Sequence, residues 1–198
     1  MKTILCFGDS LTAGYGVKHD ESYPALIQQK LDQRGWAVRV VNAGLSGDTT
    51  QGGLSRLAYW LQQPFDIFVL ELGINDLFRA VPPAQIQANL QTIISRVKVA
   101  QPQARQLLVG MEAPLAGLTL PVVVPQVDAF HRLFRYLAED NALPLVPFLL
   151  RGVAGQPHLN LMDRLHPNAA GYQRVAETVW EELEKIVLPL VSACEPKR

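Results

Sequence analysis

A serine near the start of this chain has the position that nucleophilic chemistry on a carbonyl carbon requires. Ser10 follows an apolar run over residues 4–7, directly after Gly8 and Asp9. The run predicts a buried strand, and in an open α/β sheet ligands bind at the carboxyl ends of the strands. A serine there is a candidate nucleophile if the chain also supplies a base, an acid and donors for an oxyanion.

A candidate acid and a candidate base lie together late in the chain. Asp163 and His166 stand in a loop that precedes a predicted helix. The imidazole can take the serine proton, and the carboxylate can orient the imidazole and stabilise its charged form. The alternative is that both residues only cap the helix, and this segment alone does not separate the two interpretations. Of the 4 histidines, the others are poorer bases, since they occupy a charged stretch, a predicted helix and a loop after a proline: His19, His131 and His158.

Two further residues follow predicted strands and can donate hydrogen bonds to an oxyanion. Gly44 follows the strand over 38–41, and its N–H can approach a substrate closely because glycine has no side chain. Asn75 follows the strand over 66–72 and offers a side-chain amide. Each alone is better explained as turn chemistry, but a parallel sheet gathers its strand ends at one edge. The coincidence predicts an oxyanion hole made by the Ser10 N–H, the Gly44 N–H and the Asn75 side chain.

The elements that must position these residues alternate along the chain as short apolar strands and longer helical patterns. This alternation is typical of βαβ units and a parallel sheet. The predicted fold class is α/β, a flavodoxin-like three-layer α/β/α arrangement whose five-stranded parallel sheet has the order 2-1-3-4-5. Four predicted strands cover residues 4–7, 38–41, 66–72 and 106–111, and the fifth, interrupted by proline, lies within 143–148. The predicted helices cover residues 22–34, 54–62, 82–99, 127–140 and 167–187.

Composition bounds the classes of function. The chain of 198 residues is 48% hydrophobic and 18% charged, which suits a single domain, expected over 1–188, with a polar C-terminal tail over 189–198. Basic and acidic residues number 18 each, and this balance argues against a nucleic acid partner. No apolar stretch approaches the roughly 20 residues that a membrane-spanning helix needs, so stable membrane insertion is not expected. As written, the chain is expected in the cytoplasm, or in the periplasm or outside the cell if a signal peptide preceded it.

Motifs for phosphate and metal binding are missing from the sequence. Gly14 and Gly16 lack the third glycine of a dinucleotide fingerprint, because position 19 is a histidine, and there is no P-loop pattern. Neither paired cysteines nor an H-E-x-x-H pattern indicates zinc. With only Cys6 and Cys194, no disulfide framework is implied, and Cys6 is expected to be a small buried residue of the first strand.

Four sequence blocks resemble those of the SGNH (GDSL-type) hydrolases. In the family's order they are Gly8–Leu11, Gly44, Gly73–Asp76 and Asp163–Pro167. The resemblance extends from residue 3 to about residue 183. Residues 46–49 and 71–73 are most similar to the bacterial subgroup of thioesterase I, lysophospholipase and arylesterase.

The resemblance implies a serine hydrolase that acts on small-molecule carboxylic esters and thioesters through an acyl-enzyme. It implies Ser10 as the nucleophile, His166 as the base and Asp163 as the acid that orients the base. Gly44 and Asn75 would complete the oxyanion hole with the Ser10 N–H. Asp9 would support the nucleophile turn, and the family needs no metal or organic cofactor.

An apolar groove for the acyl chain is expected beside the nucleophile. Its candidates are Leu77, Phe78, Met111, Leu115 and Leu118, the last two in the proline-rich segment 112–125; the alternative is that these residues close the core beneath a loop. A small pocket would instead favour a short-chain acyl or carbohydrate acetyl esterase of the same family. A non-catalytic binding module on this fold would show an incomplete triad, whereas all three residue types are present here.

Overall fold

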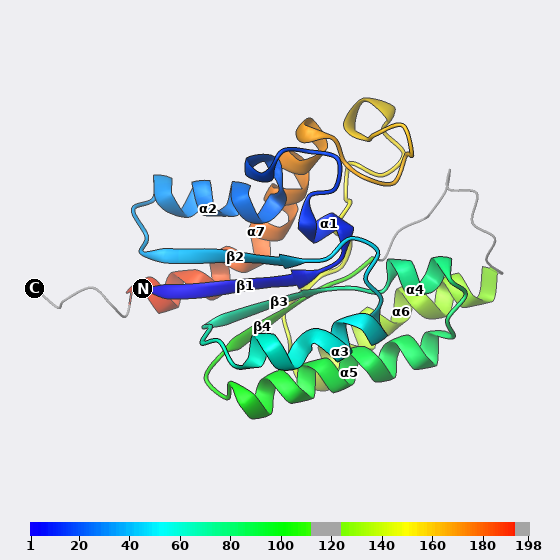
Figure 1. Ribbon diagram of the computed structural model, residues 1–198, viewed down its shortest axis with the longest axis horizontal. Helices are drawn as coiled ribbons and strands as arrows, with labels where there is room; N and C mark the ends of the chain where they lie inside the picture. The colour runs from blue at the N-terminus through cyan, green and yellow to red at the C-terminus, as the bar shows by residue number, and fades with distance from the viewer. Residues whose placement is uncertain (112–123, 193–198) are drawn as a thin grey trace, which may run out of the picture.

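A parallel sheet forms the centre of the molecule, with helices on both of its faces (Figure 1). The computed structural model describes residues 1–111 and 124–192. In this part of the chain the sheet has five strands in the order β2-β1-β3-β4-β5, which confirms the predicted fold class and strand order. The strands are β1 (Lys2–Gly8), β2 (Val38–Gly44), β3 (Ile67–Glu71), β4 (Arg105–Val109) and β5 (Leu145–Val146).

The helices divide between the two faces of the sheet. α2 (Tyr23–Gln33) and α7 (Ala169–Ser192) pack together on one face, while α3 (Thr50–Leu61), α5 (Pro83–Ala100) and α6 (Val124–Asn141) cover the other (Figure 1). The shorter helical elements follow strands or connect helices: α1 (Ser10–Ala13), η1 (His19–Glu21), α4 (Ile74–Phe78) and η2 (Pro157–Leu159). None of the described helices is long and apolar enough to cross a membrane.

The strands are apolar along their length because helices cover both faces of the sheet. Every residue of β3 is buried, as are the last five residues of β1. Cys6 lies in β1 as expected, and burial raises the pKa of its thiol to about 12. The parallel register places Gly8 opposite both Gly44 and Glu71, so the segments that follow β1, β2 and β3 meet at one edge.

Several element boundaries differ from the predicted ones. α3 begins at Thr50 and not at residue 54, because the Thr49 hydroxyl caps it by accepting from the Gly52 N–H at 3.1 Å. β5 lies within 143–148 as predicted, and it has only 2 residues because Pro144 and Pro147 on either side of it have no N–H for a sheet ladder.

The C-terminal helix also runs further than predicted. α7 continues through Pro189 to Ser192, so the first residues of the predicted tail are helical and the others lie outside the described residues. Residues 112–123 of the predicted loop over 112–125 also lie outside the described residues. Residues 124 and 125 are the first two of α6. The assignment of a domain over 1–188 stays a prediction.

Candidate active site

Ser10 occupies the first position of α1, directly after β1 ends at Gly8. The Asp9 carboxylate caps this helix by accepting from the Leu11 N–H at 2.9 Å. The short helix ends at Gly14, which has φ 85° and ψ 45°, a left-handed conformation that glycine adopts without strain. The sharp turn from strand to helix therefore holds Ser10 at the carboxyl edge of the sheet, with 7% of the residue exposed.

His166 connects Ser10 with Asp163. Its Nε2 lies 2.9 Å from Ser10 Oγ, and its Nδ1 lies 2.7 Å from Asp163 Oδ2. A carboxylate can only accept a hydrogen bond, so Nδ1 carries the hydrogen and Nε2 accepts from the serine hydroxyl. The Tyr15 ring packs on the imidazole at 4.6 Å between centroids. The chain thus brings the three predicted residues together in the geometry of a nucleophile, base and orienting acid.

Asp163 also organises its own loop. Its Oδ1 accepts from the N–H groups of Leu165 at 2.9 Å and His166 at 3.0 Å. Partial burial acts to raise the pKa of Asp163, but these N–H groups and the His166 ring outweigh it, so the pKa of this carboxyl is lowered. Asp163 thus shapes its own loop with one oxygen and contacts His166 with the other, and its lowered pKa favours the charged form.

The Gly44 N–H lies at the end of β2 and donates to Asn42 Oδ1 at 3.0 Å. A side chain at position 44 would collide with α1, because its Cβ would lie 2.2 Å from the Ala13 nitrogen. Only glycine therefore allows β2 and α1 to approach this closely.

Asn75 lies in α4, immediately after the turn that follows β3. Its Nδ2 donates to Asp9 Oδ2 at 3.0 Å and to the Asp48 carbonyl at 2.9 Å. The Ser10 N–H stands at the first position of α1, where the helix itself supplies no acceptor. The three predicted oxyanion donors thus follow adjacent strands at one sheet edge, and those of Gly44 and Asn75 already donate within the protein.

A second carboxylate behind the nucleophile was missed by sequence reasoning. Glu71 ends β3 and is fully buried together with Asp9. Its Oε2 accepts from the Asp9 N–H at 3.2 Å and from Thr12 Oγ1 at 2.8 Å, and Thr12 in turn meets the Tyr23 hydroxyl at 3.0 Å. The available signal was a charged residue at the end of an otherwise apolar strand.

Burial dominates the electrostatics of this pair. Burial, followed by the charge of Glu71, raises the pKa of Asp9 well above its ordinary range. Burial likewise raises the pKa of Glu71, although hydrogen bonds from Thr12 and Asp9 oppose the shift. The pair therefore retains a proton under conditions where exposed carboxyls have lost theirs.

The expected acyl groove receives little support from the described residues. Leu77 and Met111 are each 1% exposed within the hydrophobic core, which favours the alternative that they close the core. Phe78 is half-buried and packs against the same core. Leu115 and Leu118 lie outside the described residues.

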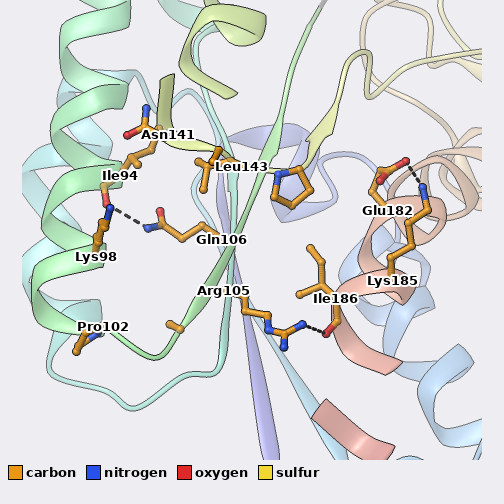
Figure 2. Close-up of a pocket in the computed structure, with 13 residues that line it drawn as sticks. Ile94, Lys98, Pro102, Arg105, Gln106, Asn141, Leu143, Glu182, Lys185 and Ile186 are labelled. Carbon is orange, nitrogen blue, oxygen red and sulfur yellow. Dashed lines mark hydrogen bonds and ion pairs between the residues drawn. The ribbon is translucent and has the colours of Figure 1, made fainter. Parts of the chain in front are cut away.

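A separate cavity of about 440 Å³ opens at the other end of the sheet (Figure 2). Its walls come from the segments that precede β4 and β5 together with α5 and α7, and they include Lys98, Arg105, Gln106 and Lys185. Ser10 lies at the carboxyl ends of the strands, so this cavity does not open onto the nucleophile. Among the described residues, no three histidine, cysteine or acidic side chains are grouped as a metal site would require.

Comparison with characterised sequences identifies relatives over nearly the whole chain. The GDSL-like lipase/acylhydrolase family matches residues 6–174. Esterase TesA of Pseudomonas aeruginosa is 36% identical over 188 residues, which cover 94% of this chain and 90% of the relative. An arylesterase of Vibrio mimicus is 36% identical over 185 residues, covering 92% and 88%. The thioesterase 1/protease 1/lysophospholipase L1 of Escherichia coli is 34% identical over 188 residues, covering 93% and 85%.

Solved structures agree with the sequence relatives. A crystal structure of TesA has a TM-score of 0.84 and 36% identity, covering 93% of this chain and 99% of that one. The psychrotrophic esterase EstA from Pseudoalteromonas also has a TM-score of 0.84, with 29% identity and coverage of 94% and 99%. The resemblance predicted from the four sequence blocks is thereby confirmed. This chain belongs to the GDSL-like lipase/acylhydrolase family.

Proposed function

We propose that this protein hydrolyses carboxylic esters with Ser10 as the nucleophile, His166 as the general base and Asp163 as the residue that orients the base. One observation carries the assignment. The His166 ring bridges Asp163 Oδ2 at 2.7 Å and the Oγ of Ser10, 156 residues away in the sequence, at 2.9 Å. Membership in an acylhydrolase family supports the reaction class.

The reaction has two steps of the same form. Ser10 Oγ bonds to the carbonyl carbon while its proton moves to His166 Nε2. The bond from that carbon to the leaving oxygen or sulfur then breaks, and the leaving group takes the proton from Nε2. A water molecule next bonds to the acyl carbon and gives its proton to Nε2, and Ser10 leaves as the hydroxyl with that proton.

Charge on the carbonyl oxygen is stabilised, in this proposal, by the N–H groups of Ser10 and Gly44 and by the Asn75 amide. The oxyanion competes with Asn42 Oδ1 for the Gly44 N–H and with Asp9 Oδ2 for the Asn75 amide, as both contacts exist without substrate. A full negative charge is a stronger acceptor than the neutral amide oxygen of Asn42, or than a carboxyl oxygen of Asp9 when its raised pKa keeps it protonated. Asp9 supports the nucleophile turn by capping α1 and contacting Asn75.

The substrate class is proposed to include thioesters and acyl chains of medium or long length. The names of the relatives support this, since they include an arylesterase and a thioesterase/lysophospholipase. Phe78, with Leu115 and Leu118, is proposed to contact the acyl chain. A short-chain acyl or carbohydrate acetyl esterase is the second candidate from the same family.

Hydrolysis of p-nitrophenyl esters from acetate to palmitate, measured beside acyl-CoA, tests the proposal. Ser10→Ala provides the blank, and Ser55→Ala on the exposed side of α3 is the matched control. We expect turnover that Ser10→Ala abolishes and Ser55→Ala leaves unchanged. A maximum at medium or long chains with acyl-CoA turnover supports the thioesterase assignment, and a preference for acetate alone selects the short-chain esterase. If no substrate shows Ser10-dependent turnover, the proposed function is wrong.

A further inference from the structure

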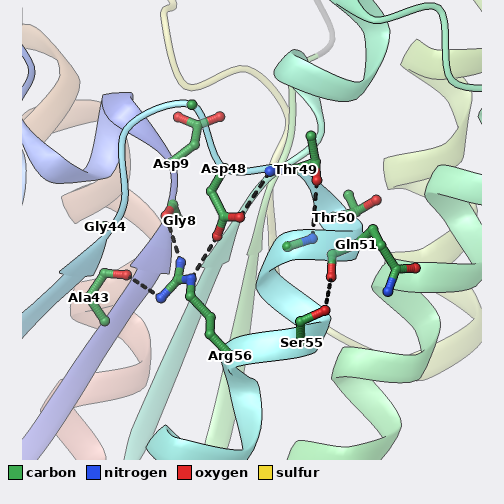
Figure 3. Close-up of polar contacts among 12 residues, drawn as sticks. Gly8, Asp9, Ala43, Gly44, Asp48, Thr49, Thr50, Gln51, Ser55 and Arg56 are labelled. Atoms are coloured by element: carbon green, nitrogen blue, oxygen red, sulfur yellow. Dashed lines mark hydrogen bonds and ion pairs between the residues drawn. The ribbon is translucent and has the colours of Figure 1, made fainter.

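Arg56 projects from α3 toward the strand ends that carry the candidate site (Figure 3). Three of its nitrogens donate to three separate segments. Nη2 donates to the Gly8 carbonyl at 2.9 Å, Nη1 to the Ala43 carbonyl at 2.8 Å, and Nε to Asp48 Oδ2 at 2.7 Å. A planar guanidinium can make these bonds simultaneously because its five N–H groups lie in a fixed fork.

These acceptors are linked to the proposed oxyanion donors, one of them directly and two through a neighbouring group. The Ala43 carbonyl and the Gly44 N–H belong to one trans peptide unit, which is planar, so holding the oxygen fixes the direction of the N–H. The Gly8 carbonyl belongs to the peptide unit directly before Asp9, the residue that caps the helix of Ser10.

The third contact reaches Asn75 through the backbone of Asp48. Arg56 holds the Asp48 carboxylate, while the Asp48 carbonyl accepts from Asn75 Nδ2 at 2.9 Å. One side chain on α3 therefore contacts the segments that carry Ser10 and Gly44 directly, and it reaches Asn75 through Asp48.

The surroundings of Arg56 favour a fixed position. Its side chain is 20% exposed and that of Asp48 is 5% exposed, so the ion pair is largely shielded from water. The guanidinium carbon also lies 3.8 Å from the centroid of the Phe7 ring, within the range of a cation–π contact. A partly buried pair with several hydrogen bonds holds its geometry better than an exposed ion pair does.

We propose that Arg56 is a positioning residue that aligns the three oxyanion donors for the transition state. The inference rests on the proposed function, because it concerns the same oxyanion hole. Arg56 does not touch the substrate; it acts through the peptide unit of Gly44, the turn before Ser10 and the Asp48 carbonyl that holds Asn75. Its loss lowers transition-state stabilisation more than substrate binding.

The test compares Arg56→Lys and Arg56→Met with the same substitutions at Arg34. Arg34 is a matched control, since it pairs with Glu184 at 2.8 Å and lies 4.8 Å from the Trp180 ring centroid, on the α2 and α7 side of the sheet. For each variant kcat and KM are measured on the best p-nitrophenyl ester, together with the denaturant midpoint of unfolding. The inhibition constant of a trifluoromethyl ketone is also measured, because its adduct with a serine places a negative oxygen in an oxyanion hole.

We expect Arg56→Lys to lower kcat at least about tenfold with KM within about threefold, since a single ammonium cannot replace three directed donors. The affinity for the trifluoromethyl ketone should fall in parallel with kcat/KM. Arg34 variants should change neither value. Guanidinium ion at millimolar concentration should partly restore kcat in Arg56→Ala, whereas an equal concentration of urea should not.

Two results would overturn the inference and a third would also overturn the proposed function. Arg56→Lys with wild-type kcat, or with a raised KM and unchanged inhibitor affinity, shows that Arg56 does not align the donors. A loss of kcat that follows the unfolding midpoint equally in Arg34 and Arg56 variants shows only a structural role. If the wild-type protein has no Ser10-dependent turnover, the proposed function fails, and this inference fails with it. If Arg56→Met does not fold, Arg56→Lys decides.

Discussion

Two aspartates lie near Ser10 in opposite environments. Asp9 stands in the turn before it, on the buried side, and Asp163 lies beyond the His166 ring, on the exposed side. Asp163 has 42% of its side chain exposed, whereas Asp9 is fully buried beside Glu71. Burial acts to raise the pKa of both residues. At Asp163 the N–H donors and the His166 ring reverse that effect, while at Asp9 the charge of Glu71 adds to it. The pKa values of these two aspartates are therefore shifted in opposite directions.

These opposite pKa shifts indicate which aspartate can serve the base. An acid that stabilises the imidazolium must stay ionised where the enzyme works, and the lowered pKa of Asp163 ensures this. Asp9 contacts Leu11 and Asn75 and is not positioned on His166. The exposed side of Ser10 is therefore suited to the chemistry, and the buried side to holding the turn in place.

Of the changes at these two aspartates and their partners, Asp163→Asn should have the largest effect on activity. The amide can still accept from the N–H groups of Leu165 and His166, so the loop should keep its shape. It cannot stabilise the charged imidazole, and we expect kcat to fall by roughly 10²–10⁴-fold. The free energy of unfolding should change by less than about 1 kcal/mol, as for most exposed substitutions.

Asp32→Asn is the control for that measurement. Asp32 is exposed on α2, and its side chain accepts a hydrogen bond from the exposed side of the same helix, from Gln28 at 2.8 Å. Its kcat should equal that of the wild type. A kcat for Asp163→Asn within threefold of the wild type would remove Asp163 from the mechanism. A large loss of stability would show that its main role is structural.

The exposed side of the site was predictable from the sequence because its signals are local. Ser10 ends an apolar run, and Asp163 and His166 share one short segment, so residue type and spacing were informative. Parallel topology then explains why the ends of β1, β2 and β3 meet. The resemblance to a known family placed these residues in the same roles.

The buried side was not predictable in the same way. Glu71 ends a strand whose apolar pattern says nothing about a carboxylate pair, and Arg56 stands in an ordinary amphipathic helix. Their partners lie 62 residues away for the Glu71 bond to Asp9 and 48 residues away for the Arg56 bond to Gly8. Such contacts arise only when the helix packs on the sheet, so they depend on tertiary structure.

Glu71→Gln tests the raised pKa values of the buried side through the pH dependence of stability. Because the folded pKa values of Asp9 and Glu71 are raised, the folded state binds protons that the unfolded chain has released above about pH 4. The contribution of this pair to stability is therefore greatest at low pH and is lost as the pH rises through the raised values. Removing one carboxyl should therefore make the variant gain stability relative to the wild type as the pH rises above about 4.

Urea unfolding at several pH values measures this difference. Glu177→Gln on the exposed face of α7 is the control, and its stability should run parallel to that of the wild type. At neutral pH the kcat of Glu71→Gln should stay within about threefold, because the amide oxygen can still accept from the Asp9 N–H and Thr12. Parallel pH–stability curves for Glu71→Gln and the wild type would show that the pair holds no extra proton.

Thr12→Val gives the smallest expected effect and tests how far the buried side is separate from the chemistry. Thr12 is fully buried, and its hydroxyl lies 2.8 Å from Glu71 Oε2 and 3.0 Å from the Tyr23 hydroxyl. Valine has nearly the same shape but leaves both partners one hydrogen bond short, which should cost about 1–2 kcal/mol of unfolding free energy. The double variant with Tyr23→Phe should cost less than the sum of the single ones, since the two hydroxyls share one bond. The kcat of Thr12→Val should stay within about twofold; a tenfold loss without a matching loss of stability would show that the buried network takes part in the reaction itself.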